Sequence, residues 1–176
     1  DSVGVEAVIS PILTKMVSDV RDLLDAKARA KGRRKLLLGV RVPPSLQTPP
    51  EIAQYPGMEH AIMNASCLEK GLEVKTWIDE GHVDYVCPSL SWPHWPGLPY
   101  TKEFVDLARG TDVGIYPTLF PVPTWVHGAD AKPIERDDHE RLLQYKNEFC
   151  RLALQLYDDG ADGISTYNWT PHAQRG

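Results

Sequence analysis

The segment LLLGVRV (36–42), closed by Pro43-Pro44, decides the fold class of this 176-residue chain. It is an apolar run without polar alternation, interrupted only by Arg41 near its end. Such a run is typical of a parallel strand that is buried on both faces. We therefore predict a buried parallel strand over 36–42.

Helices and strands alternate along the rest of the chain. Ser10-Pro11 has the form of an N-cap followed by proline at the first helical position, and Gly32 supplies a stop, which predicts a helix over 11–31. Strands that alternate with helices indicate βα units and a parallel sheet. The other predicted strands cover 83–88, 113–119, 161–167 and, from alternating apolar residues, 3–9; the other long helices cover 102–109 and the segment from 137 to Gly160.

Composition narrows the function classes. The net charge of −5 gives no sign of a nucleic-acid partner, and no apolar run approaches the roughly 18 residues that span a membrane. No signal peptide is visible after Asp1, so the sequence leaves the localisation open. Cys67, Cys87 and Cys150 are widely spaced and predict free thiols rather than a disulfide framework.

Four ordered motifs carry a resemblance to a known family. They are LGVRVPPSL (38–46), GLEVKTWIDEG (71–81) with VDY (83–85), FVDLARGT (104–111) with VGIYP (113–117), and YDDGADGI (157–164) through Asn168-Trp169. In this order they resemble the fifth to eighth strand units of glycoside-hydrolase-like TIM-barrel proteins of environmental bacteria, often described as family-10-like glycosyl hydrolases. The resemblance spans 36–169 apart from 47–66 and 120–135. Residues 1–10 lack the charged segment that the family has around strand four.

The resemblance implies a single partial domain over 1–176: about four βα units of a (β/α)₈ TIM barrel, or a half-barrel. A closed barrel has eight strands and typically about 250 residues. Four or five strands leave two sheet edges and an uncovered inner face. We therefore expect a homo-oligomer or a complementary half-barrel to complete the ring.

Aromatic residues follow the predicted strands where a barrel binds its ligand, at the carboxyl ends. Four of the five tryptophans lie there, and aromatic rings on one face can stack on sugar rings while polar groups bind the hydroxyls. We predict a carbohydrate site; the alternative is that the tryptophans only fix long loops to the rim. The predicted substrate-binding residues are Arg41, Trp92, His94, Trp95, Tyr116, Trp125, His127, Tyr167, Asn168 and Trp169.

Arg41 has two interpretations, a substrate-binding arginine or a structural partner of a carboxylate. Glycoside hydrolysis generally uses two carboxylates. Asp84 and Asp162 lie at the amino ends of their strands and are interpreted as structural. The remaining catalytic candidates are Glu6, if 3–9 is a strand, and Asp130 in a rim loop, so the pair can lie partly outside this chain.

No metal or cofactor is expected. The acidic segment 137–140 suits the first turn of a helix, and nothing fixes the spacing of His94, His127 and His172 as zinc ligands. Two hypotheses remain: a glycoside-hydrolase-like barrel segment that cleaves glycosidic bonds with carboxylates missing here, or a non-catalytic half-barrel that binds sugar and pairs with itself. A flavin or aldolase type of barrel lacks support, because no phosphate-site glycines follow the last strands and no lysine lies within a strand.

Overall fold

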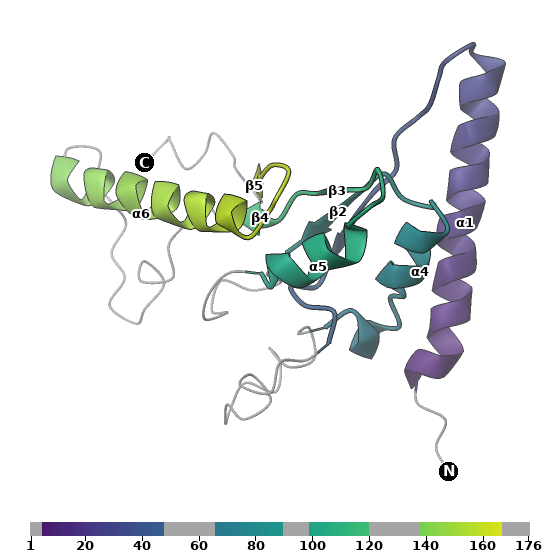
Figure 1. Ribbon diagram of the computed structural model, residues 1–176, viewed down its shortest axis with the longest axis horizontal. Helices are drawn as coiled ribbons and strands as arrows, with labels where there is room; N and C mark the ends of the chain where they lie inside the picture. The colour runs from purple at the N-terminus through teal and green to yellow at the C-terminus, as the bar shows by residue number, and fades with distance from the viewer. Residues whose placement is uncertain (1–4, 48–65, 90–98, 120–137, 167–176) are drawn as a thin grey trace.

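The computed structural model describes residues 5–47, 66–89, 99–119 and 138–166 (Figure 1). These residues contain four α-helices, five short strands and one 3₁₀ turn, joined by loops. In chain order the elements are α1 (Val5–Ala30), β1 (Gly39–Val42), η1 (Leu68–Lys70), α4 (Val74–Asp79), β2 (Tyr85–Pro88), α5 (Thr101–Ala108), β3 (Gly114–Ile115), β4 (Thr118–Leu119), α6 (His139–Asp158) and β5 (Ser165–Thr166).

Every strand pair is parallel, and the strands are ordered as they are in the chain. β1, β2 and β3 form one sheet in that order, and β4 pairs with β5 in a second. The predicted strand 113–119 is split into β3 and β4, which belong to different sheets. The pairing nevertheless runs through the break, because the amide of Tyr116 donates to Val86 and the carbonyl of Pro117 accepts from Ser165. The prediction of a mixed α/β fold with parallel strands is therefore confirmed, and neither described sheet is closed.

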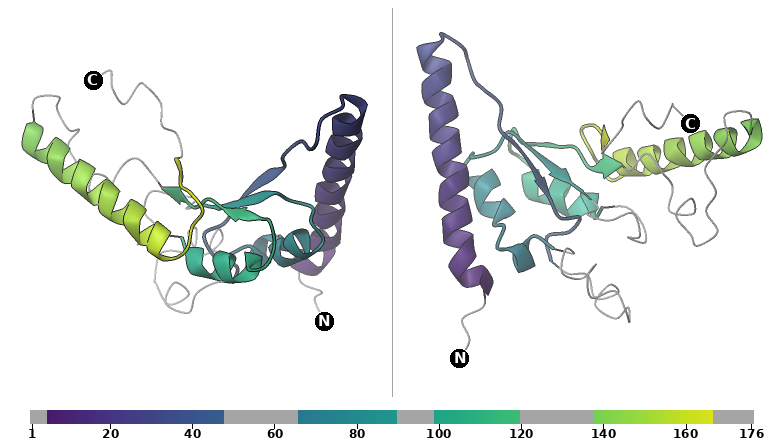
Figure 2. Two further views of the ribbon diagram at one scale, coloured as in Figure 1. Left: turned by 45° about the horizontal axis from the view of Figure 1, so that its top comes forward. Right: turned by 180° about the vertical axis from the view of Figure 1, so that it is seen from behind.

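The helices α4 and α5 cover one face of the sheet (Figure 2). The strand residues Val42, Val86 and Ile115 point to that face and pack with Trp77 and Phe104 of the two helices. Val86 and Phe104 are completely buried. Since side chains alternate along a strand, the intervening residues point to the opposite face.

Two strands begin with the same anchor. The Asp84 amide donates to the Leu38 carbonyl at 2.8 Å, and its carboxylate accepts from the Leu38 amide at 2.7 Å. Asp162 makes the same two contacts with Ile115, at 3.0 and 2.8 Å. Each aspartate thus binds both backbone groups of a residue on the preceding strand, which confirms the structural role predicted for these two acids.

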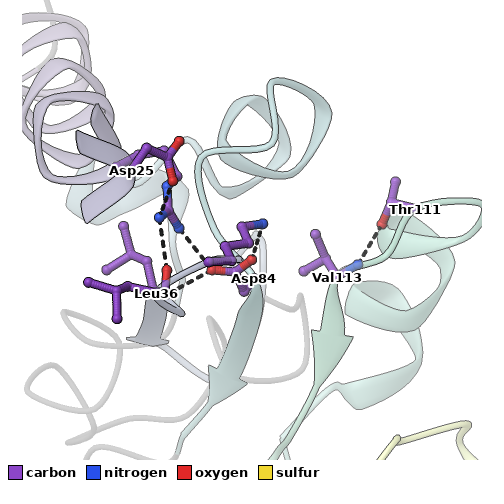
Figure 3. A network of polar contacts seen from close by, with 8 residues as sticks. Asp25, Leu36, Asp84, Thr111 and Val113 are labelled. Carbon is purple, nitrogen blue, oxygen red and sulfur yellow. Dashed lines mark hydrogen bonds and ion pairs between the residues drawn. The ribbon is translucent and has the colours of Figure 1, made fainter. Parts of the chain in front are cut away.

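Asp84 also joins α1 to the sheet. The Arg21 side chain, 6% exposed, donates to the Asp84 carboxylate at 2.9 Å, to Asp25 at 2.5 Å and to the Leu36 carbonyl at 2.8 Å (Figure 3). Lys35 forms a further ion pair with Asp84. The start of β1, the start of β2 and the middle of α1 therefore meet at one carboxylate.

The predicted strand over 3–9 is wrong. α1 begins at Val5 and runs through Pro11, so Ser10 is a buried helical residue and not an N-cap. Four alternating apolar residues also fit a helical repeat, and here Val8 and Ile12 continue the periodicity of the following turns. Position 6 thus lies in the first turn of a helix, so the strand on which the catalytic interpretation of Glu6 depended does not exist.

None of the helices within the described ranges has both the length and the hydropathy that crossing a membrane requires. The longest is α1, with 26 residues and a polar side that carries Lys15 and Asp22.

We predict that Asp84→Ala lowers the free energy of unfolding by about 3–5 kcal/mol, because it breaks a buried ion pair, leaves Arg21 with only one of its two carboxylates and leaves the Leu38 amide without its acceptor. The matched control is Asp79→Ala, which removes an exposed carboxylate paired with Lys75 and should cost at most about 0.5 kcal/mol. Urea denaturation of both variants measures the difference. Equal losses in the two variants would contradict the assigned role of Asp84.

The Asp84 carboxylate should also make the stability of the protein depend on pH. Burial acts to raise the pKa of Asp84, but hydrogen bonds from Lys35 and the Leu38 amide and the charges of Lys35 and Arg21 outweigh it, so that the pKa falls below its ordinary 3.8. Its stabilisation is therefore complete above the unfolded-state pKa and is lost as the pH falls through the lowered folded-state pKa. The stability gap between the wild type and Asp84→Asn should stay constant near neutral pH and shrink in acid below the ordinary carboxyl pKa. Urea titrations along a pH series test this, and a gap that does not change with pH would count against it.

Candidate functional site

The candidate site is the sheet face that the helices leave uncovered, which we call the open face. It carries the strand residues that alternate with the buried core: Gly39, Arg41, Tyr85, Cys87, Gly114, Tyr116, Thr118 and Ser165. Arg41 is exposed, and Tyr85 and Cys87 are half-buried. This face therefore retains access to solvent within the described part of the chain.

Two tyrosine rings lie over glycines on the open face. A Cβ atom on Gly39 would overlap the ring of Tyr85, and Cβ atoms on Gly114 and Gly163 would lie 2.6 and 2.8 Å from the ring of Tyr116. The two rings meet edge to face, with their centroids 5.7 Å apart. Because these glycines have no side chain, both rings can lie directly against the sheet.

Polar groups follow toward the carboxyl ends of the strands. Arg41 of β1 is in register with Cys87 of β2. The Tyr116 amide donates to the carbonyl of Val86, the residue before Cys87. The hydroxyls of Thr118 and Ser165 share a hydrogen bond of 2.7 Å. Thr118 is buried, and the Tyr116 ring lies back over Gly114, so Arg41 and the half-buried Ser165 are the polar groups with access to solvent here.

The Cys87 thiol is not set up as a nucleophile. Burial raises its pKa, and a hydrogen bond with Ser165 and the positive charge of Arg41 offset this only in part. A thiol with a raised pKa stays protonated at neutral pH, and the thiolate is the reactive form. The role of Cys87 on the open face is therefore that of a small, weakly polar surface group.

Sequence reasoning missed one acid, Glu103 in the first turn of α5. Its carboxylate accepts the Leu46 amide at 2.9 Å, just after β1. Burial raises the pKa of Glu103, and its charge adds to the burial that raises the pKa of Cys67 to about 12. A raised carboxyl pKa is a property of general acids, but this carboxylate is engaged by a backbone amide and holds a loop. Nothing in the sequence distinguishes it from an ordinary acid at a helix N-terminus.

The structure brings together two of the predicted substrate-binding residues. Arg41 and Tyr116 both lie on the open face, and Tyr116 is 36% exposed. The remaining predicted residues lie outside the described ranges: Trp92, His94, Trp95, Trp125, His127, Tyr167, Asn168, Trp169 and the catalytic candidate Asp130. Within the described ranges no three His, Cys, Asp or Glu side chains are grouped as metal ligands.

A hollow of about 430 Å³ opens at the opposite end of the sheet, beside the amino ends of the strands. Three carboxylates line it, those of Asp84, Asp112 and Asp162. Two of them bind the neighbouring strand, as described above, and the amino end of a parallel barrel serves stability rather than ligand binding. Tyr85, Gly114 and Tyr116 of the open face also line the hollow, so it adjoins the candidate site at the amino ends of the strands.

Comparison with known proteins adds no assignment: no protein-family model and no curated protein matches the chain.

We predict that Gly39→Ala destabilises the protein by about 1–3 kcal/mol, because the added methyl group displaces the Tyr85 ring from its place on the sheet. The double variant Gly39→Ala/Tyr85→Ala should regain part of this loss, since the overlap is then removed. Urea denaturation of the four members of this double-mutant cycle measures the coupling. Additive losses would show that the ring does not lie over Gly39.

Proposed function

We propose that this chain forms half of a glycoside-hydrolase-like TIM barrel and binds carbohydrate at the carboxyl ends of its strands. The observation that carries the proposal is the open face, where Arg41 and Tyr116 lie on one side of a parallel sheet whose helices α4 and α5 lie on the other. In a TIM barrel the helices form an outer ring and the opposite strand face lines the interior. The strand order, which follows the chain order, fits that architecture.

The chemistry of the open face suits a sugar ring. The C–H face of a pyranose is apolar and stacks on an aromatic ring such as Tyr116, while its hydroxyls need polar partners. Arg41, which is exposed, and Ser165, which is half-buried, provide a guanidinium and a hydroxyl toward the same edge of the sheet. Sites that bind small molecules combine an apolar surface with a few placed polar groups in this way.

Parallel strands also explain how the predicted rim could contribute. The described strands end at Val42, Pro88, Leu119 and Thr166, and the carboxyl ends of parallel strands share one edge of a sheet. The segments with the predicted rim residues all follow these ends in the chain. Their contribution to the carbohydrate site stays a prediction, because these residues lie outside the described ranges.

Hydrolysis would require carboxylates that the described strands do not provide. None of the residues in β1 to β5 is acidic, and Asp84 and Asp162 bind the preceding strand at the amino ends. This observation favours the second candidate function, a sugar-binding half-barrel without catalysis of its own. A glycan array followed by hydrolysis assays on the bound glycans separates the two: cleavage supports the hydrolase, and binding without cleavage supports the binding module.

We predict that Tyr116→Ala and Arg41→Ala each weaken binding of the best array oligosaccharide at least about tenfold, since a lost stacking or charged contact is worth on the order of 1.4 kcal/mol or more. The matched controls are Leu68→Ala and Arg33→Ala, two exposed residues outside the open face, which should bind as the wild type does. Isothermal titration calorimetry measures the affinities. The proposal fails if no glycan binds or if both open-face variants keep the wild-type affinity.

A further inference from the structure

The helix α1 has an apolar surface that the rest of the described chain leaves largely exposed; Ile9 at its edge lies close to Gly71. Val8, Ile12, Met16 and Val20 recur every four residues, and three of them are more than half exposed, with Ile12 at 65%. Residues at this spacing share one side of a helix. We define the α1 flank as the exposed residues Val8, Ile9, Ile12, Met16, Val20 and Leu23.

The α1 flank lies beside the side that faces the core. Val17 and Arg21 point inward to the core and to Asp84, and Lys15 and Asp22 lie on the polar side. The apolar residues of α1 thus cover a wider arc of the helix than the part that packs on the core. Such a wide arc is typical of a helix with a neighbour on each side.

The helix α6 has a matching surface at the other end of the molecule. Leu142, Leu143, Leu154 and Tyr157 are exposed and form the α6 flank, while Leu156 on the same helix is buried. α1 and α6 lie at opposite ends of the sheet (Figure 1). The strands at these ends, β1 and β5, each have an unpaired edge within the described sheets.

We propose that the α1 flank of one copy of this chain packs against the α6 flank of a second copy, so that two half-barrels close one eight-stranded ring. This inference rests on the barrel architecture of the proposed function and names its partner. Since every strand is parallel, β5 of one copy can pair with β1 of the other as β1 pairs with β2. A two-fold axis then repeats the same contact on the other side and leaves no open edge.

The number of exposed apolar side chains suits a second copy. The two contacts of a closed pair would cover twenty large apolar side chains. Specific interfaces bury roughly 1,200 Å² or more in total, and their buried centres are depleted in charged residues. Asp19, which lies among the α1 flank residues, is already paired with Lys15 and brings no unpaired charge to the contact.

Sedimentation velocity of the full chain over a dilution series tests the inference. We expect a species with twice the mass of one chain. A monomer at all concentrations overturns the proposal, and so does a mass that keeps growing with concentration, because that result describes an open chain of copies.

Variants then locate the contact. Met16→Lys on the α1 flank and Leu154→Glu on the α6 flank should each weaken dimerisation at least about tenfold, since each buries a charge in an apolar contact. The matched controls Asp22→Lys and Gln155→Glu place the same charges on the polar sides of the two helices and should dimerise as the wild type does. Equal weakening by the controls would overturn the assignment of the flanks.

Mixing the two weakened chains gives the sharpest result. In a mixed pair one contact carries both substitutions, with an ammonium group opposite a carboxylate, and the other contact is unchanged. The mixture should therefore dimerise more tightly than either variant alone, which unfolding of the variants would not produce. Sugar titrations on the same samples keep the two proposals apart, because a monomer that binds glycan overturns only the dimer, and a dimer that binds none overturns only the carbohydrate site.

Discussion

The rest of the described structure depends on the carboxylate of Asp84. It accepts hydrogen bonds from the Leu38 amide and from Arg21, and it forms an ion pair with Lys35. Buried charges are tolerated only where they are paired and hydrogen-bonded, and the ends of parallel strands leave backbone groups that need partners. One carboxylate meets both requirements, so the position of α1 and the alignment of β1 with β2 depend on a common set of contacts.

The second anchor, at Asp162, explains how such short strands keep their register. A shift of one residue would turn Val86 and Ile115 from the helix-covered face to the open face, and two to four residues of pairing hold a register only weakly. Asp84 and Asp162 fix the alignment at the amino end of their strands, because each binds both the amide and the carbonyl of one residue on the strand before. The glycines Gly81 and Gly160, with φ of +68° and +98°, end the preceding helices and let the chain turn into these anchors.

The sequence predicts those parts of the fold that depend on local patterns. Apolar runs and glycine stops located the parallel strands, because burial on both faces of a strand leaves a continuous apolar signal. The start of α1 was mispredicted, since alternation over four residues is ambiguous and Pro11 is tolerated inside the helix. Arg21 and Glu103 show the other limit: each acts through a partner more than fifty positions away, Asp84 and Leu46, and no spacing in the sequence records such a pair. Of the predicted site residues, Arg41 and Tyr116 lie on the open face, and they were predicted because a charge and an aromatic ring stand out within apolar strands.

The two ends of the sheet carry different chemical groups. At the amino ends, the carboxylate of Asp84 is surrounded by donors that lower its pKa, so it remains a charged structural group at neutral pH and cannot act as a proton donor. Toward the carboxyl ends, the open face has Arg41 and the half-buried Ser165, and burial raises the pKa of its Cys87 thiol, which stays protonated. None of the residues in β1 to β5 is acidic, so the described strands bring no carboxylate to the open face. Any bond cleavage at this face would have to draw its acid and base from outside these strands, which ties catalysis to completion of the site.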